Sequence, residues 1–450
     1  MGDFSTIADF TFASPDLIPD EVLSAAALLL LDTIGVAAGA CDLAAAKIAR
    51  ETAVQLFQAA SDGAVPLMFD GRMTSKAGAA FAGATQIDNL DAHDGYNPTK
   101  GHIGCAVVPA LFSYAAAHPH LSGREALACM VIGYEIATRA GLALHATASD
   151  YHTSGAWNAL GVAAMGCRLH GATSEQLRHA FGIAEYHGPR SQMMREIATP
   201  TMLHDGSGMG ALIGVMSSEM AIRGFEGAPA ATVEADNVRA HWDDLGQYWT
   251  VPLNYIKPYP ICRWAHAALD AIDALRVQNS FTADTVKAIT VRTFKEAAQL
   301  FPGIPDTTSK AQYSLGYAVA KMVQHGRVGV EQIMDSAFQD PDTAALLERI
   351  TIVEDAKHSA RFPEARWSDV SVDLTNGRTL HSGDVHARGG PGAPLSNAEI
   401  LDKFSALCSV SIDHVRTDAI AEASLNLLHE GARFSQLAKL VAPPTSKAPL

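Results

Sequence analysis

The run of small and apolar residues at positions 23–40, LSAAALLLLDTIGVAAGA, indicates how this chain folds. Alanine, leucine and glycine at this density, with one carboxylate among them, are typical of a helix that is buried on all sides. Asp20 and Glu21 precede the run in place of the basic residues of a signal peptide, and Asp32 interrupts it after about ten residues, short of the ~20 that a membrane span needs. We therefore expect a buried core helix and a cytoplasmic protein.

Similar helical runs continue to about residue 230. The stretches KAGAAFAGATQ at 76–86 and LGVAAMGCRLHG at 160–171 are again rich in alanine and glycine, which lets helix axes approach closely. Ser122, Thr173 and Ser396 each have Glu or Gln three residues later, a capping-box pattern that marks a helix start. These patterns predict a large all-α helical domain.

The pattern changes after residue 285. The stretches VKAITVRTF at 286–294, ERITIVEDA at 348–356 and DVSVDLTNGRTLHSGDV at 369–385 are rich in β-branched residues, and Asn376-Gly377 predicts a hairpin with a type I′ turn. Helices are predicted at 310–326 and 342–350. The fold class is thus mainly α, with a helical domain built from residues 1–268 and 394–450 and a smaller α+β domain at 269–393.

Composition narrows the class of function. Of 450 residues, 48% are hydrophobic and 18% are charged, which suits a well-buried globular enzyme. The net charge of −15 repels nucleic acids and acidic membrane surfaces, so we expect neither as a partner. The six cysteines are scattered, without a C-x-x-C pair or a ligand spacing typical of a metal centre, so we expect buried thiols in a reducing compartment and no metal.

Three polar stretches stand out, and each leads into an apolar helix. A fourth stretch, HDGSGMG at 204–210, is rich in glycine like a phosphate-binding loop. We do not predict such a loop there, because the stretch lacks the preceding strand and the glycine spacing that the loop needs. The three stretches carry the following ionisable residues: Asp91, His93, Asp94, Lys100 and His102 in the first; His152 in the second; Lys257, Tyr259, Arg263 and His266 in the third.

Together these stretches supply histidines, carboxylates and cations without an evident activated serine or cysteine. Such a set can take a proton from the carbon next to a carboxylate and stabilise the enolate-like charge with Lys or Arg. Histidine suits this task because its pKa of ~6.5 lets it accept and donate a proton near neutrality. We therefore expect acid–base chemistry on a carboxylic acid.

The same stretches resemble the MmgE/PrpD family, which includes 2-methylcitrate dehydratase, cis-aconitate decarboxylase and iminodisuccinate epimerase. The resemblance runs through nearly the whole chain, in the family's order, from LLLDTIGVAAGA through NLDAHDGYNPTKGHIGCAVVPAL and IKPYPICRWAHAALDA to SKAQYSLGYAVAKMVQHG. It implies a helical domain assembled from both chain ends, an α+β lid domain, a cleft between them, a homodimer and no cofactor.

The resemblance also implies site residues. His102 and His152 would form the acid/base pair, with Asp91 orienting one imidazole, Lys257 clamping a carboxylate and Tyr317 closing the site from the lid. Lys100, His204 and Arg263 would bind the substrate, a small di- or tricarboxylic acid.

The chain departs from the family pattern at three positions and by one extra residue before His102. His93 stands where the family has the second aspartate of D-x-D-D-T, and Gly95 replaces its threonine. Thr201 replaces the lysine of T-K-x-L-H, which reaches toward a substrate carboxylate. Because each unpaired carboxylate in a dry site is costly, losing that lysine favours a smaller or less charged acid than a citrate.

These observations favour a cofactor-independent lyase, a dehydratase of the 2-methylcitrate type or a near relative. A decarboxylase and an epimerase of an amino or imino dicarboxylate are the alternatives within enzymes, since both need the same proton transfers. Outside enzymes, the alternative is a carboxylate-binding scaffold that has lost turnover.

Overall fold

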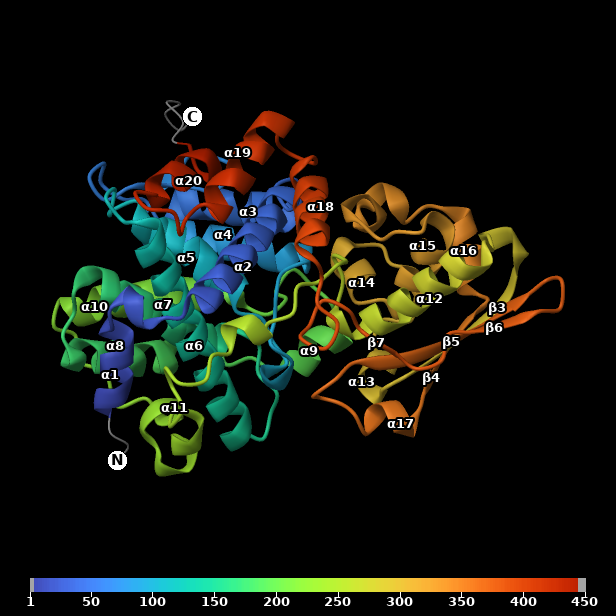
Figure 1. Cartoon of the computed structure of the whole chain (residues 1–450), viewed down its shortest axis with the longest axis horizontal. Coiled ribbons are helices and arrows are strands. Elements are labelled where there is room, and N and C mark those ends of the chain that lie inside the picture. The colour runs from blue at the N-terminus through green and yellow to red at the C-terminus, as the bar shows by residue number, and fades with distance from the viewer. Residues whose placement is uncertain (1–3, 444–450) are drawn as a thin grey trace.

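A computed structural model describes residues 4–443 of the chain. It shows a large helical body and a smaller lobe that carries the main sheet, side by side in Figure 1. The chain is mainly helical, with a mixed sheet in its C-terminal region, as the sequence predicts.

The body begins with eleven helices among the described residues. They are α1 (Phe4–Phe12), α2 (Asp20–Gly39), α3 (Ala44–Leu56), α4 (Lys76–Leu90), α5 (Gly104–Ala115), α6 (Gly123–Thr147), α7 (Gly155–His170), α8 (Ser174–His187), α9 (Met193–Ala198), α10 (Ser207–Ile222) and α11 (Ala231–Glu234). A two-stranded ribbon of β1 (Val65–Pro66) and β2 (Met73–Thr74) lies between α3 and α4. The full capping box predicted at Thr173 is present at the start of α8.

The smaller lobe surrounds a five-stranded sheet. Its helices are α12 (His266–Asn279), α13 (Lys295–Ala298), α14 (Thr308–Gln312), α15 (Leu315–His325), α16 (Pro341–Leu347) and α17 (Ala356–Ser359), and its strands are β3 (Val286–Thr293), β4 (Ile350–Glu354), β5 (Trp367–Leu374), β6 (Thr379–His381) and β7 (Val385–His386). The strand order is β4-β3-β5-β6, with β7 also paired to β5. Only the β3–β4 pair is parallel among these strands.

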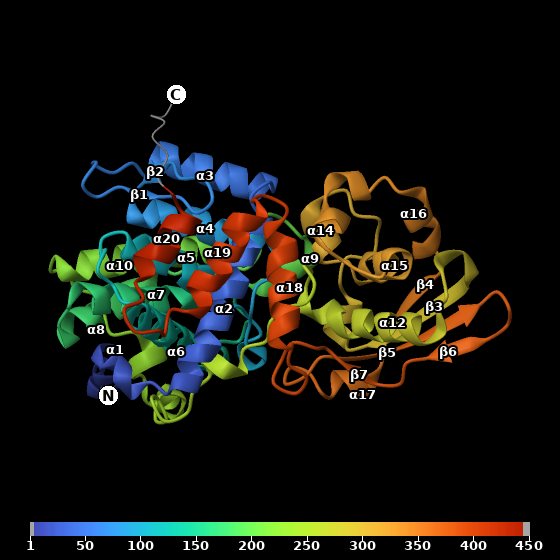
Figure 2. The ribbon, with the colours of Figure 1, turned by 45° about the horizontal axis from the view of Figure 1, so that its top comes forward.

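The chain then returns to the body. Helices α18 (Asn397–Cys408) and α19 (His414–Leu425) pack against α2, and α20 (Phe434–Val441) packs against α5. Figure 2 shows α18 along the border between the body and the smaller lobe. Segments from both ends of the chain therefore share one helical core.

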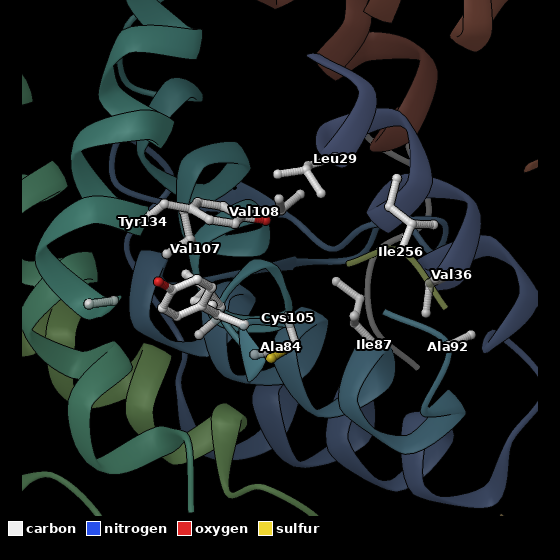
Figure 3. Packing of buried hydrophobic residues seen from close by; sticks show 14 of the residues in the cluster. Leu29, Val36, Ala84, Ile87, Ala92, Cys105, Val107, Val108, Tyr134 and Ile256 are labelled. Carbon is white, nitrogen blue, oxygen red and sulfur yellow. The ribbon is translucent and has the colours of Figure 1, made fainter. Parts of the chain in front are cut away.

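Small residues let the central helices pack closely. A Cβ added at Gly161 of α7 would lie 2.2 Å from the carbonyl oxygen of Gly133 in α6, and one added at Gly210 of α10 would lie 2.6 Å from that of Gly155 in α7. Figure 3 shows apolar side chains of α2, α4, α5 and α6 meeting in this core, among them Leu29, Val36, Ala84, Ile87, Cys105, Val107, Val108 and Tyr134. The glycine and alanine runs of the sequence are thus the helix contacts of the body.

Two helices, α2 and α6, are long and apolar enough to cross a membrane, but 83% and 94% of their apolar windows are buried inside the protein. Burial on all sides is what the run at 23–40 predicts. The six cysteines are also buried, with free thiols.

The hairpin between β5 and β6 differs from the predicted turn. Leu374 N–H donates to the Arg378 carbonyl at 2.8 Å, which closes a three-residue loop, and of its residues only Gly377 has a positive φ, 85°. A type I′ turn needs positive φ at both central residues, so the prediction of that turn is wrong. The glycine is needed for its left-handed backbone, while Asn376 stays in an ordinary conformation.

Candidate active site

Four loops meet on one side of the helical body. They are the loop between α4 and α5 (residues 91–103), the loops before α7 (148–154) and before α10 (199–206), and the segment before α12 (254–265). Asp91 ends α4 with a left-handed backbone, φ 55°, which turns the chain into the first loop. The contacts described below join residues from all four.

Asp91 and Lys257 form a buried ion pair. The Lys257 ammonium contacts the Asp91 carboxylate and also donates to the Asp91 carbonyl oxygen at 3.0 Å, and both side chains are almost fully shielded from solvent. Burial raises the pKa of Asp91 to about 6, while Lys257 acts in the opposite direction. At neutral pH the carboxylate is therefore ionised and holds the ammonium in place.

His102 is oriented from both sides. Its Nδ1 lies 2.7 Å from the carbonyl oxygen of Asp94, so we assign the proton to Nδ1 and the lone pair to Nε2. Nε2 lies 3.7 Å from Oδ2 of Asp205. The Asp205 carboxylate is fixed by Ser154, whose backbone N–H and hydroxyl donate to Oδ1 at 3.1 and 2.6 Å.

The environment of His102 keeps the imidazole neutral. Burial and then the nearby Lys257 ammonium lower the pKa of His102 to about 4. A neutral imidazole with a free Nε2 lone pair beside a carboxylate is a general base at neutral pH, and Asp205 can stabilise the imidazolium that forms.

A second imidazole packs against the first. The ring centroids of His93 and His102 are 4.4 Å apart, and His93 is fully buried. Within the described residues neither ring nitrogen of His93 has a hydrogen-bond partner, although Nε2 lies 3.6 Å from Oδ1 of Asp88. Burial lowers the pKa of His93 well below its usual value, so the imidazole is neutral. His93 therefore places an uncharged polar side chain where the family pattern has a carboxylate.

A second buried ion pair ties the C-terminal helices to the first loop. Lys403 of α18 lies 2.6 Å from the Asp32 carboxylate of α2 and donates to the Ala92 carbonyl at 2.7 Å. The single carboxylate in the apolar run at 23–40 therefore anchors the loop that carries Asp91 and His93.

A pocket of about 580 Å³ adjoins the cluster, and His204 connects the two. His204 lines the pocket, has φ 46° and is nearly fully buried, and its Nε2 has no partner among the described residues. Its ring lies 5.6 Å from that of Tyr313 in the smaller lobe. Burial lowers the pKa of His204 to about 4, so this predicted binding residue is neutral at pH 7.

Two predicted catalytic residues make their contacts elsewhere. His152 Nδ1 lies 2.8 Å from the carbonyl oxygen of Asp150, and its ring stacks on His145 at 6.5 Å. No ring contact or hydrogen bond between residues 4 and 443 joins His152 to His102. The structure therefore pairs His102 with His93 and not with the predicted His152.

Tyr317 is the second of these residues. Its hydroxyl donates to the Gln332 carbonyl at 2.8 Å, inside the smaller lobe, and its side chain is buried there. The tyrosine that faces the cluster is Tyr313, four residues earlier in the same stretch. Its hydroxyl makes no hydrogen bond within the described part of the chain.

The other predicted cations lie at the edges of the cluster. The Arg263 guanidinium is buried 4.4 Å from the Tyr255 ring centroid and donates to the carbonyls of Ala387, at 2.9 Å, and Arg388. Tyr255 in turn lies 6.2 Å from His102, ring to ring. Lys100 is half-buried with its ammonium 4.8 Å from the Tyr151 ring centroid, and burial followed by the charge of Arg366 lowers its pKa.

Sequence reasoning missed three residues of this region. Asp205 lies in HDGSGMG, a stretch that draws attention by its glycines, and Tyr313 is close to the tyrosine that was predicted. Glu196 lines the pocket and carries no motif at all. A sequence signal existed for the first two, as polar residues next to helix starts, but none for Glu196.

Among the described residues, three groups of side chains could offer ligands to a cation; Asp355, His358 and Asp369 in the smaller lobe form one, and the other two lie in this cluster. Asp91, His93 and His102 form one, and Asp88, His93 and Cys105 the other, each with ligand atoms within 4.8 Å of one another. In the first group the Lys257 ammonium already contacts Asp91 and supplies the positive charge that a divalent ion would bring. The residues thus favour lysine as the electrophilic partner at this position.

Comparison with protein-family models identifies the family of the chain. The N-terminal domain of the MmgE/PrpD family matches residues 6–241, and the C-terminal domain of the same family matches residues 259–427. No curated protein matches the chain closely enough to count as a relative. Because the two family domains span nearly the whole length, the chain belongs to the MmgE/PrpD family.

Proposed function

We propose that this protein is a lyase that removes the proton next to a carboxylate of a small carboxylic acid and expels a hydroxyl group, as a dehydratase does. The family consists mostly of dehydratases and other lyases. The observation that carries the proposal is the placement of the neutral His102 imidazole between the Asp205 carboxylate and the Asp91–Lys257 pair.

In the proposed reaction His102 Nε2 takes the α-proton. Asp205 stabilises the resulting imidazolium, and the Lys257 ammonium stabilises the negative charge that develops on the substrate carboxylate. We assign the proton that goes to the leaving hydroxyl to Tyr313, whose own hydroxyl is protonated at neutral pH because burial holds its pKa well above the usual value. The Tyr313 ring lies beside His204 at the pocket, whereas His152 contacts Asp150 and His145, so we favour Tyr313 as the proton donor.

The test is proton NMR of di- and tricarboxylic acids incubated with the enzyme in D2O, paired with thermal unfolding of the protein in the same acids. An alkene product supports the proposal. Loss of a carbon identifies a decarboxylase and exchange of the α-hydrogen alone an epimerase, so either result replaces the dehydratase assignment. Stabilisation by an acid without any change in it identifies a binding scaffold.

The acid limb of the kcat/KM profile should include the protonation of Asp91. His102, with a pKa of about 4, stays neutral down to low pH, whereas Asp91, with a pKa of about 6, loses its charge as the pH falls below 6. Protonation of Asp91 releases the Lys257 ammonium, so we expect kcat/KM to fall as the pH drops through about 6.

The variant Asp91→Asn is the control for that profile. It removes the group that titrates near 6, so the fall in kcat/KM through about pH 6 should be absent from its lower activity. An unchanged acid limb in this variant would show that another group controls the profile.

A further inference from the structure

Two arginines near the cluster are buried without a carboxylate to pair with. Arg366, which precedes β5, is 2% exposed, and Arg263 is 3% exposed. Between residues 4 and 443 neither guanidinium forms an ion pair with an Asp or Glu, and the Nε atom of each has no hydrogen-bond partner. Burial lowers the pKa of both groups, that of Arg263 to about 10, which leaves them charged at neutral pH. Because a buried charge without a counter-charge is costly, an anion that reaches them would be favoured.

One stretch of backbone holds the two arginines near each other. The Arg263 guanidinium donates to the Ala387 carbonyl at 2.9 Å, and the Ala387 N–H donates to the Arg366 carbonyl at 3.0 Å. Besides burial, the charge of Arg366 contributes to the lower pKa of Arg263. The Asn97 side-chain amide donates to the Glu364 carbonyl at 3.3 Å, so the first loop also contacts the segment that carries Arg366. The two unpaired charges therefore lie where the smaller lobe meets that loop.

Tyr255 connects the arginines with His102. Its ring centroid lies 4.4 Å from the guanidinium carbon of Arg263 and 6.2 Å from the ring centroid of His102. Burial raises the pKa of Tyr255, and the charges of Arg263 and Arg366 are the largest opposing causes. The hydroxyl is thus protonated at neutral pH, and within the part of the chain that the structure describes it makes no hydrogen bond. It is a free donor beside two cations.

Gly95 leaves the space that the phenol of Tyr255 occupies. The two residues exchange backbone hydrogen bonds, with the Gly95 N–H donating at 3.1 Å and the Tyr255 N–H at 2.8 Å. A Cβ at position 95 would lie 2.4 Å from the Tyr255 hydroxyl oxygen, so the threonine of the family pattern does not fit while Tyr255 is in place. The departure from the pattern at Gly95 therefore brings the hydroxyl of Tyr255 against the loop that carries His102.

We propose that Arg366, Arg263 and Tyr255 form an anion-binding subsite for a second acid group of the substrate, the carboxylate that does not take part in proton removal. The two guanidiniums supply the charge, and the Tyr255 hydroxyl donates a hydrogen bond. Arg366 is then a binding residue that the smaller lobe contributes. This inference rests on the proposed function, in which His102 takes the proton and Lys257 stabilises the reacting carboxylate.

Isothermal titration of the full-length protein with two matched acids tests this. Malate carries the hydroxyl group that the proposed reaction expels and two carboxylates. In its C1 monoamide a neutral amide of the same shape replaces the carboxylate that does not react. We expect malate to bind at least about tenfold more tightly than the monoamide, the ratio that charge-assisted hydrogen bonds provide. Equal affinities, or no binding of malate, overturn the proposal.

Three variants locate the origin of that preference. Arg366→Gln removes the charge and should bring the two affinities within about threefold of each other, whereas Arg366→Lys keeps the charge and should retain most of the preference. Arg361→Gln is the matched control, because Arg361 lies in the same segment but already pairs with Asp384 at 3.1 Å, and it should behave as wild type. A preference that is unchanged in Arg366→Gln, or lost equally in Arg361→Gln, overturns the proposal.

Thermal unfolding separates binding from a structural role of Arg366. Arg366→Gln leaves no buried carboxylate without its partner, so its unfolding midpoint without added acid should be at or above that of wild type, and malate should raise it less. A lower midpoint together with an unchanged malate preference would make Arg366 structural and overturn the proposal. If Arg366→Gln fails to fold, Tyr255→Phe decides. It removes only an unpartnered hydroxyl and should weaken malate at least about threefold, and an unchanged malate affinity in it overturns the proposal.

The same samples, transferred to D2O, separate this inference from the proposed function. An Arg366-dependent preference for malate without hydrogen exchange or elimination in any acid would refute the proposed function and leave the subsite. Exchange or elimination by the wild type, with a ratio of malate to monoamide affinity that does not depend on Arg366, would refute the inference and leave the proposed function.

Discussion

Replacing His102 with asparagine is expected to lower kcat by about 100-fold or more, the range in which general acid–base groups contribute. The asparagine amide can still donate to the Asp94 carbonyl, which His102 Nδ1 contacts at 2.7 Å, but the variant has no basic nitrogen at the position of Nε2. Circular dichroism and thermal unfolding should stay close to wild type, because the substitution removes no ion pair whose loss would strand a buried charge.

His152→Asn is the matched control. Its imidazole contacts the Asp150 carbonyl and the His145 ring, away from His102, so we expect its turnover to stay within a few-fold of wild type. Equal losses in the two variants would show that His152 reaches the substrate after all. Near-normal turnover in His102→Asn would remove His102 from the mechanism.

Replacing Lys257 with methionine is expected to affect both folding and activity. The substitution leaves Asp91 buried without its counter-charge, a change that typically lowers the free energy of unfolding by about 3–5 kcal/mol. It also removes the ammonium proposed to stabilise the substrate carboxylate, so kcat/KM should fall by about 100-fold or more. Chemical denaturation and steady-state kinetics measure the two effects.

The double variant Asp91→Asn with Lys257→Met separates these effects. It removes both charges at once, so most of the lost stability should return while activity stays low. Recovery of activity together with stability would mean that Lys257 serves only the fold.

The sequence predicts the architecture well because the relevant signals are local. The alanine and glycine runs become buried helices, the capping box at Thr173 begins α8, and β-branched stretches become β3, β4 and β5. The sequence predicts the hairpin at the right place but with the wrong type of turn. The choice between a two-residue and a three-residue loop depends on the register of β5 and β6, which Asn376-Gly377 alone does not specify.

The site was harder to predict because its partners come from distant segments. The Asp91–Lys257 contact joins residues 166 positions apart, and Asp205 reaches Ser154 across 51 positions. Motifs name candidate residues but not the direction of a side chain, so the sequence points to His152 and Tyr317 and does not single out Asp205 and Tyr313. Only helix packing decides which polar loop residues share one cavity.

Deuterium incorporation next to a substrate carboxylate tests the central claim most directly. An acid selected as a substrate is incubated in D2O with wild-type enzyme, His102→Asn and His152→Asn, and the α-hydrogen signal is followed by proton NMR. The account predicts exchange or elimination with the wild type and with His152→Asn, and neither with His102→Asn. Exchange at the wild-type rate in His102→Asn would contradict it.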